Sequence, residues 1–98
     1  MEKVYVVVEE YVFDGTEINV TIFSTLEKAK EHFNKVVETE EKNSWIADLI
    51  NELADKENNG FDIDNFDSYI EKEDTYYHAY DNNDYYETTI YIEEKEIL

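Results

Sequence analysis

The chain has 98 residues and carries 26 acidic side chains against eight basic ones, all of them lysine, which gives a formal net charge of −18. So few lysines, diluted by carboxylates, exclude direct binding of nucleic acid, and an acidic surface is repelled by anionic lipid. The absence of cysteine excludes disulfides and thiolate metal sites. Hydrophobic content of 42% and aromatic content of 15% argue against disorder, so we expect one domain, residues 1–98, around one core.

Residues 1–5 lack the basic start and apolar run of a signal peptide. No apolar stretch approaches the roughly 18 residues that a membrane-spanning helix needs. We therefore expect a cytoplasmic protein that does not contact membranes.

A hairpin is predicted at the start of the chain. An apolar run over residues 4–13 leads to Asp14-Gly15, and this dipeptide favours a type I′ turn because both central residues need positive φ. Beyond the turn, three aliphatic residues alternate with polar ones, so we expect the second strand to bury them on one face. They are Ile18, Val20 and Ile22.

Two helices are predicted next. Ser24-Thr25-Leu26-Glu27 fits a capping box with Ser24 as the cap, and apolar residues follow at helical spacing: Leu26, Ala29, Phe33, Val36 and Val37. After a polar break at residues 39–42, Asn43 or Ser44 caps a second helix that runs to about Asp55, and Asn58-Asn59-Gly60 favours a left-handed end. This second helix has one apolar and one acidic face.

The end of the chain predicts a second hairpin. The stretch of residues 61–73 stays open, because residues 61–66 alternate like a strand but contain aspartates, which disfavour one, and a short helical turn fits equally well. Residues 75–80 and 85–92 are β-rich and flank the polar segment 81–84. The resulting fold class is α+β with the order ββααββ, a mostly antiparallel sheet of about four strands with two helices on one face.

Metal binding has a weak basis in the sequence. Residues 55–60 begin like a calcium loop, but the twelfth position holds Phe66 in place of a bidentate glutamate. Asp62, Asp64 and Asp67 leave a loose site for a hard cation open, with a solvated loop as the alternative. We expect no metal and no cofactor.

Catalysis also has little to build on, because a nucleophile needs an adjacent base. His32 lies on the flank of the first helix. His78 has Glu87 as its cross-strand neighbour if Asn82-Asn83 is the turn, and we interpret that pair as structural. We expect that the protein is not an enzyme.

Acidic residues concentrate in the second part of the chain. Residues 43–98 carry sixteen acids and three lysines, against ten and five in residues 1–42, and several acids alternate with tyrosines, which are enriched at interfaces. The candidate partner-binding residues are Asp48, Glu52, Asp55, Glu71, Glu73, Tyr77, Asp81, Asp84, Tyr85 and Glu87. The alternatives are that the acids form an ordinary solvated face and that the tyrosines form ordinary cross-strand pairs that stabilise the sheet.

The spacing of these acids suggests a mimic of nucleic acid. Carboxylates on one strand face, as in Glu71 and Glu73, recur about every 6.6–6.8 Å and helix positions four apart about every 6 Å, each near twice the 3.4 Å phosphate rise of DNA. The leading hypothesis is a noncatalytic acidic inhibitor, of the phage anti-defence type, that binds a nuclease or another basic nucleic-acid-binding protein. It requires the negative potential to gather over one side of the fold. The alternatives are an immunity protein to a nuclease toxin and an α+β domain that forms a homodimer through a sheet edge or tyrosine face.

The opening of the chain resembles that of many small uncharacterised acidic proteins of bacteria and phages. A Val-rich strand, the Asp14-Gly15 turn and a second strand lead into Phe23-Ser24-Thr25-Leu26-Glu27-Lys28-Ala29-Lys30, and those proteins begin strand-turn-strand before a capped helix. The Lys-, Asn- and Ile-rich, Arg- and Pro-free composition is also typical of AT-rich genomes. The resemblance implies no activity.

Overall fold

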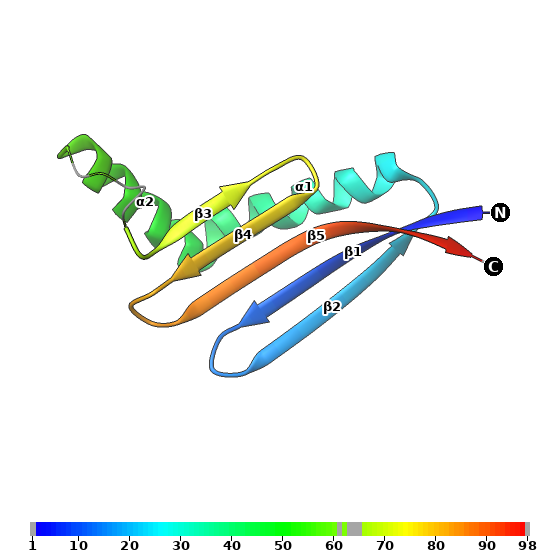
Figure 1. The fold of residues 1–98 in the computed structure, drawn as a ribbon, viewed down its shortest axis with the longest axis horizontal. Helices are drawn as coiled ribbons and strands as arrows, with labels where there is room; N and C mark the ends of the chain where they lie inside the picture. Colours follow the sequence, from blue (N-terminus) through cyan, green and yellow to red (C-terminus); the bar gives the residue numbers. More distant parts are fainter. Residues whose placement is uncertain (1, 61, 63–65, 98) are drawn as a thin grey trace.

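The computed structural model describes residues 2–60, 62 and 66–97, and its two helices pack on one face of a five-stranded antiparallel sheet (Figure 1). In chain order the elements are β1 (Glu2–Val12), β2 (Thr16–Phe23), α1 (Leu26–Asn43), α2 (Trp45–Asn58), β3 (Tyr69–Lys72), β4 (Tyr76–Asp81) and β5 (Tyr86–Ile97). The order of strands in the sheet is β2-β1-β5-β4-β3. The predicted α+β class is confirmed, but the predicted order lacked β3, which lies in the stretch where the sequence favoured neither strand nor turn.

The first hairpin forms where the Asp-Gly dipeptide predicted it. Asp14 and Gly15 have φ values of 57° and 144°, so both lie in the region of positive φ that this turn requires. The last paired residues are Val12 and Thr16. The connection is therefore a three-residue loop, residues 13–15, and not the two-residue turn that the sequence suggested.

The predicted burial of the aliphatic residues on β2 is wrong. Ile18, Val20 and Ile22 are 58%, 57% and 64% exposed. Val7 of β1 is buried under the helices and pairs with Thr21, so Thr21 shares the helix-covered face and its aliphatic neighbours point the other way. Alternation shows which residues share a face, but it does not show which face the helices cover.

Helix α1 begins one residue later than the capping box indicated. Thr25, and not Ser24, is the N-cap, and its hydroxyl oxygen accepts a hydrogen bond from the Lys28 amide at 3.2 Å. The helix buries Ala29, Phe33 and Val37. These three residues follow the spacing of one helical face, as the sequence predicted.

Helix α2 is capped by Ser44, one of the two residues that the sequence offered. The Ser44 hydroxyl oxygen accepts a hydrogen bond from the Ile46 amide at 3.1 Å. The helix runs three residues beyond the predicted end, and Gly60 with φ of 80° follows the cap residue Asn59. Ile46 and Leu49 are its buried residues.

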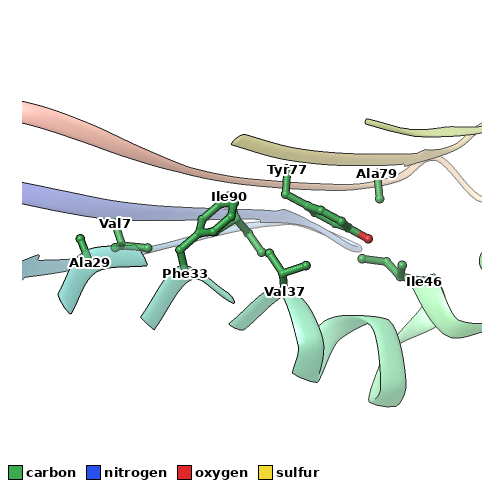
Figure 2. Close-up of a cluster of buried hydrophobic side chains, with 8 residues drawn as sticks. All are labelled: Val7, Ala29, Phe33, Val37, Ile46, Tyr77, Ala79 and Ile90. Atoms are coloured by element: carbon green, nitrogen blue, oxygen red, sulfur yellow. The ribbon is translucent and has the colours of Figure 1, made fainter. Parts of the chain in front are cut away.

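The core lies between the sheet and the helices, where side chains of both layers meet (Figure 2). Complete burial of one large apolar side chain contributes roughly 1.5–3 kcal/mol. The core cluster is formed by Val7, Ala29, Phe33, Val37, Ile46, Tyr77, Ala79 and Ile90.

The face of the sheet opposite the helices is called the outer face below. Its residues follow from the strand register and the alternation of side chains. Val6 and Val8 are buried there although no described helix covers them, because neighbours on β2 and β5 flank them in the register. No helix in the described part of the chain has the length and apolar character to cross a membrane.

Candidate functional site

Helix α2 carries an acidic ridge, defined as Asp48, Glu52 and Asp55. These residues are spaced four and three apart, so they lie on one helix face. Asp48 and Asp55 are exposed and Glu52 is half-buried. Within the described residues, no ion pair involves any of the three. The predicted acidic face of this helix is therefore present.

A cleft of about 690 Å³ lies beside the ridge, between the β1–β2 hairpin and the junction of α1 with α2. Its walls carry three carboxylates, those of Glu17, Glu40 and Asp48. Its walls also carry three aromatic rings, and none of the described lining residues is basic. The complete lining is Tyr11, Val12, Phe13, Gly15, Thr16, Glu17, Glu40, Asn43, Ser44, Trp45, Asp48 and Thr88.

Ring contacts fix the aromatic wall of the cleft. Phe13 stacks on Tyr86 with 4.3 Å between ring centroids, and Trp45 contacts the same tyrosine at 5.8 Å. Tyr86 thus links the hairpin loop to the start of α2 through β5. Such pairs contribute roughly 0.5–1.5 kcal/mol beyond their buried area, so the wall is a packed part of the fold.

Two carboxylates, buried Glu9 and half-buried Glu40, lie near the lining residue Tyr11. The Tyr11 hydroxyl donates to Glu9 Oε1 at 2.5 Å, and His32 Nε2 lies 3.7 Å from Glu9 Oε2. Burial raises the pKa of Glu40, the charge of Glu9 raises it further, and a hydrogen bond with Ser44 opposes the shift. Burial also raises the pKa of Tyr11, with the hydrogen bond and charge of Glu9 acting in the same direction. Ionised Glu40 is therefore held in an environment that disfavours its charge.

Lysines neutralise carboxylates elsewhere on the molecule. Lys42 pairs with Glu38 at 2.7 Å within α1, and Lys72 pairs with Glu41 at 3.2 Å. The remaining lysine pairs of the described residues are Lys3–Glu94, Lys30–Asp74 and Lys95–Glu93. Lys56, in the last turn of α2, lies 4.8 Å from the ring centroid of Phe66. None of these pairs involves a carboxylate of the ridge or the cleft.

The expectation that the acids gather over one side of the fold is not met. Glu10 and Glu87 lie on the outer face, whereas Glu38 and Asp48 lie on the helices. The sequence could not show this, because strands and helices each distribute their charges by their own period. A mimicry proposal therefore has to rest on the local ridge.

The predicted strand-spaced pair Glu71 and Glu73 lies at the end of β3. Glu71 lies on β3 and points to the outer face, opposite His78 in the register. Glu73 directly follows Lys72, the last residue of the strand, and its amide donates to the Tyr76 carbonyl at 2.8 Å. The role of this pair in binding stays a prediction.

Tyr77 does not belong to the surface on which the sequence analysis placed it. It is fully buried in the core, and its hydroxyl donates to Glu41 Oε2 at 3.3 Å. Burial first, and then the charge of Glu41, raise the pKa of Tyr77. Both faces of β4 carry tyrosines, so alternation alone could not identify the buried one.

The β4–β5 connection uses one predicted site residue for its own structure. Asp81 Oδ1 accepts hydrogen bonds from the Asn83 amide at 3.0 Å and the Ser68 hydroxyl at 3.4 Å. Asp84 and Tyr85 are exposed, and Tyr85 is 71% accessible with φ of 59°. The connection spans residues 82–85, longer than the two-residue turn considered for this hairpin.

The predicted contact between His78 and Glu87 is confirmed. His78 Nε2 lies 2.8 Å from Glu87 Oε2 on the outer face. The residue directly opposite His78 is Thr89, so Glu87 is a diagonal neighbour. Tyr69 and Tyr76 contact the same imidazole ring. These contacts give the pair a role in packing the outer face.

Asp55 of the calcium-like sequence lies in helix α2. The described residues contain no group of three or more side chains that could hold a metal ion. Asp64, one of the three aspartates considered for a cation, lies outside the described residues.

No protein-family model, curated protein or solved structure matches this chain. The functional argument therefore rests on the fold and the side chains. The sequence analysis did not find the cleft residues Tyr11, Glu17, Glu40 and Trp45, because the hairpin and the helix junction meet only through tertiary packing. The one local signal for the cleft was Trp45 at the start of α2. The sequence analysis assigned this residue to the apolar face of the helix.

Proposed function

We propose that this protein is a noncatalytic binding protein whose acidic ridge and cleft receive a basic protein partner, in particular one that binds nucleic acid. The observation that carries the proposal is the grouping of carboxylates without lysine partners beside a cleft. None of the lysine pairs of the described residues involves the five carboxylates of the ridge and the cleft, which are Glu17, Glu40, Asp48, Glu52 and Asp55. A surface of this kind speeds association with a basic surface and selects for it.

Mimicry of a phosphate backbone is the finer form of the proposal. Asp48 and Glu52 are four residues apart, which corresponds to about 6 Å along a helix, and two phosphate steps of one DNA strand span about 6.8 Å. The ridge is short, so it occupies two or three phosphate sites. The protein then acts as an inhibitor of a nuclease or another nucleic-acid-binding protein, of the phage anti-defence or toxin-immunity type.

Two charge-matched triple variants test this proposal. One changes the ridge (Asp48→Asn, Glu52→Gln, Asp55→Asn), and the control removes three charges elsewhere (Glu2→Gln, Glu27→Gln, Glu96→Gln). Proteins captured on the immobilised wild-type chain are identified, and their affinity is measured with and without duplex DNA. We expect the ridge variant to lose binding, the control to keep it, and both DNA and 0.5 M salt to compete. Equal losses in the two variants, or binding that DNA and salt leave unchanged, contradict the proposal.

A second candidate function, self-association, is favoured by the outer face. Ile18, Val20 and Ile22 are exposed there beside the valines of β1. Five strands and about eight residues per strand give a face of roughly 24 by 27 Å, which approaches the approximately 800 Å² per partner of a stable interface. A two-fold axis along the row of Val20, Val8 and Tyr91 brings Ile18 onto Ile22 and Lys95 towards Glu87 of the second copy, while Val6 meets Glu10. The occupant of this face is then another copy of the chain.

Sedimentation at several protein concentrations tests self-association. We expect a dimer that is stronger at 0.5 M than at 0.05 M NaCl, because salt screens the repulsion between two acidic chains. Val20→Lys on the outer face should give a monomer. Asn19→Lys adds the same charge to the opposite face of β2 and should leave the dimer intact. A monomeric mass under all conditions contradicts the candidate.

A further inference from the structure

We propose that the cleft between the β1–β2 hairpin and the α1–α2 junction binds an arginine side chain of the basic partner. This inference rests on the proposed function and assigns to its surface a specific recognition site. The cleft and the ridge share Asp48, so an arginine in the cleft belongs to a basic surface lying along α2.

The combination of carboxylates and rings favours a guanidinium over other cations. A planar guanidinium stacks on aromatic faces and donates to carboxylates in a fixed fork, whereas an ammonium is compact and strongly hydrated. The walls offer Trp45 and Tyr11 as ring surfaces and Glu17 and Glu40 as acceptors. A hard metal ion fits poorly, because the described residues contain no cluster of three ligands.

The unfavourable charge of Glu40 and the lack of basic residues in the described lining support a cationic occupant of the cleft. Glu40 is half-buried, and burial together with the charge of Glu9 raises its pKa. No described lining residue carries a positive charge. A bound guanidinium removes this unfavourable state of Glu40, since an opposite charge within about 4–6 Å favours the ionised carboxylate. A neutral or anionic ligand gives no such gain.

The size of the cleft agrees with a side chain presented by a protein. Ligand sites typically enclose about 300–1,000 Å³, and this cleft has a volume of about 690 Å³. The volume therefore accommodates an arginine together with part of the backbone that carries it. The stacked rings of Phe13 and Tyr86 hold the hairpin against the start of α2, so the site is formed before the ligand arrives.

Trp45 gives the experiment a built-in reporter, because it is the single tryptophan of the chain and lines the cleft. Its fluorescence is followed while N-acetyl-arginine amide is added at constant ionic strength. The neutral isostere N-acetyl-citrulline amide and N-acetyl-lysine amide are titrated in parallel. We expect a saturable change with the arginine derivative, a weaker affinity for the lysine derivative and no saturable change with the citrulline derivative.

Single variants locate the binding. Glu17→Gln and Glu40→Gln should each weaken the arginine affinity by about fivefold or more, the effect of losing one charge-assisted contact. Glu57→Gln is the matched control, because it removes the same charge from α2 outside both the cleft lining and the ridge, and it should change the affinity less than twofold. Circular dichroism verifies that each variant is folded.

Two results overturn the inference: no saturable change with the arginine derivative, or an equal loss in Glu57→Gln and the cleft variants. Either result leaves the proposed function to be decided by the ridge variant and its control. If partner capture still depends on the ridge while the cleft does not bind arginine, this inference fails and the proposed function stands.

Discussion

Two identical substitutions on neighbouring strands test the unexpected orientation of β2. Val7→Thr places a hydroxyl in the core, where Val7 is fully buried. Val20→Thr places the same hydroxyl on the outer face, where Val20 is 57% exposed. Both sites are internal strand positions and threonine is as favourable in strands as valine, so the difference between the variants reports burial.

The expected magnitudes differ clearly. A buried hydroxyl without a partner costs about 1–3 kcal/mol in protein mutational data, and Val7 belongs to the core cluster, with Ile92 and Thr21 as its cross-strand neighbours. An exposed substitution usually changes the free energy of unfolding by less than about 0.5 kcal/mol. We therefore expect Val7→Thr to lose at least about 1 kcal/mol more than Val20→Thr.

Urea unfolding followed by circular dichroism measures both free energies at low micromolar protein concentration, where self-association contributes least. Equal losses in the two variants, or a greater loss in Val20→Thr, would refute the orientation. In that case the aliphatic face of β2 would be the buried one, as the sequence alone suggested.

Further outcomes follow from the core, the cleft and the outer face. Phe33→Ala should destabilise the protein by about 3–5 kcal/mol, measured by the same urea unfolding, since Phe33 is 2% exposed; a loss below about 1 kcal/mol would contradict the core. Glu40→Gln should raise the stability at pH 7. The pKa of Glu40 is raised in the folded state, so its ionised form opposes folding above that pKa. The gain in stability should vanish below the ordinary pKa of 4.5, where Glu40 is protonated in both the folded and the unfolded state. A gain that persists below pH 4.5 would contradict the raised pKa of Glu40. Glu87→Gln should lower the stability by less than about 1 kcal/mol, because its contact with His78 is partly exposed, and thermal unfolding can measure this loss.

Local signals in the sequence predicted most of the elements. Asp14-Gly15 located the first hairpin because positive φ is a property of the residues themselves. Ser44 capped α2 for a similar reason, since its hydroxyl supplies the acceptor that the helix start lacks. Such features depend on neighbours within a few residues.

The relations between elements were less predictable. The aliphatic residues of β2 could face either way until the helices covered the face that carries Val7. Strand β3 is four residues long and half exposed, so its sequence shows neither a run of apolar residues nor a clear turn. Tyr77 differs from the other tyrosines of its hairpin only by the side of β4 on which it lies.

The candidate site was predicted in part for the same reason. The acidic ridge on α2 follows from helical spacing, which the sequence contains. The cleft requires the hairpin at residues 13–17 to meet the helix junction at residues 40–48, two segments more than 20 positions apart. Tertiary packing brings them together, in part through the rings that Tyr86 contacts.

The central proposal is that the ridge and the cleft form the binding surface, and that the total charge alone does not determine binding. Two-dimensional ¹⁵N–¹H NMR of the chain, titrated with a hexa-arginine peptide at 0.15 M NaCl, tests it most directly. The account predicts that the perturbed amides cluster at residues 13–17 and 40–55. Shifts spread evenly over the acidic residues of α1, β3 and β5 would contradict it.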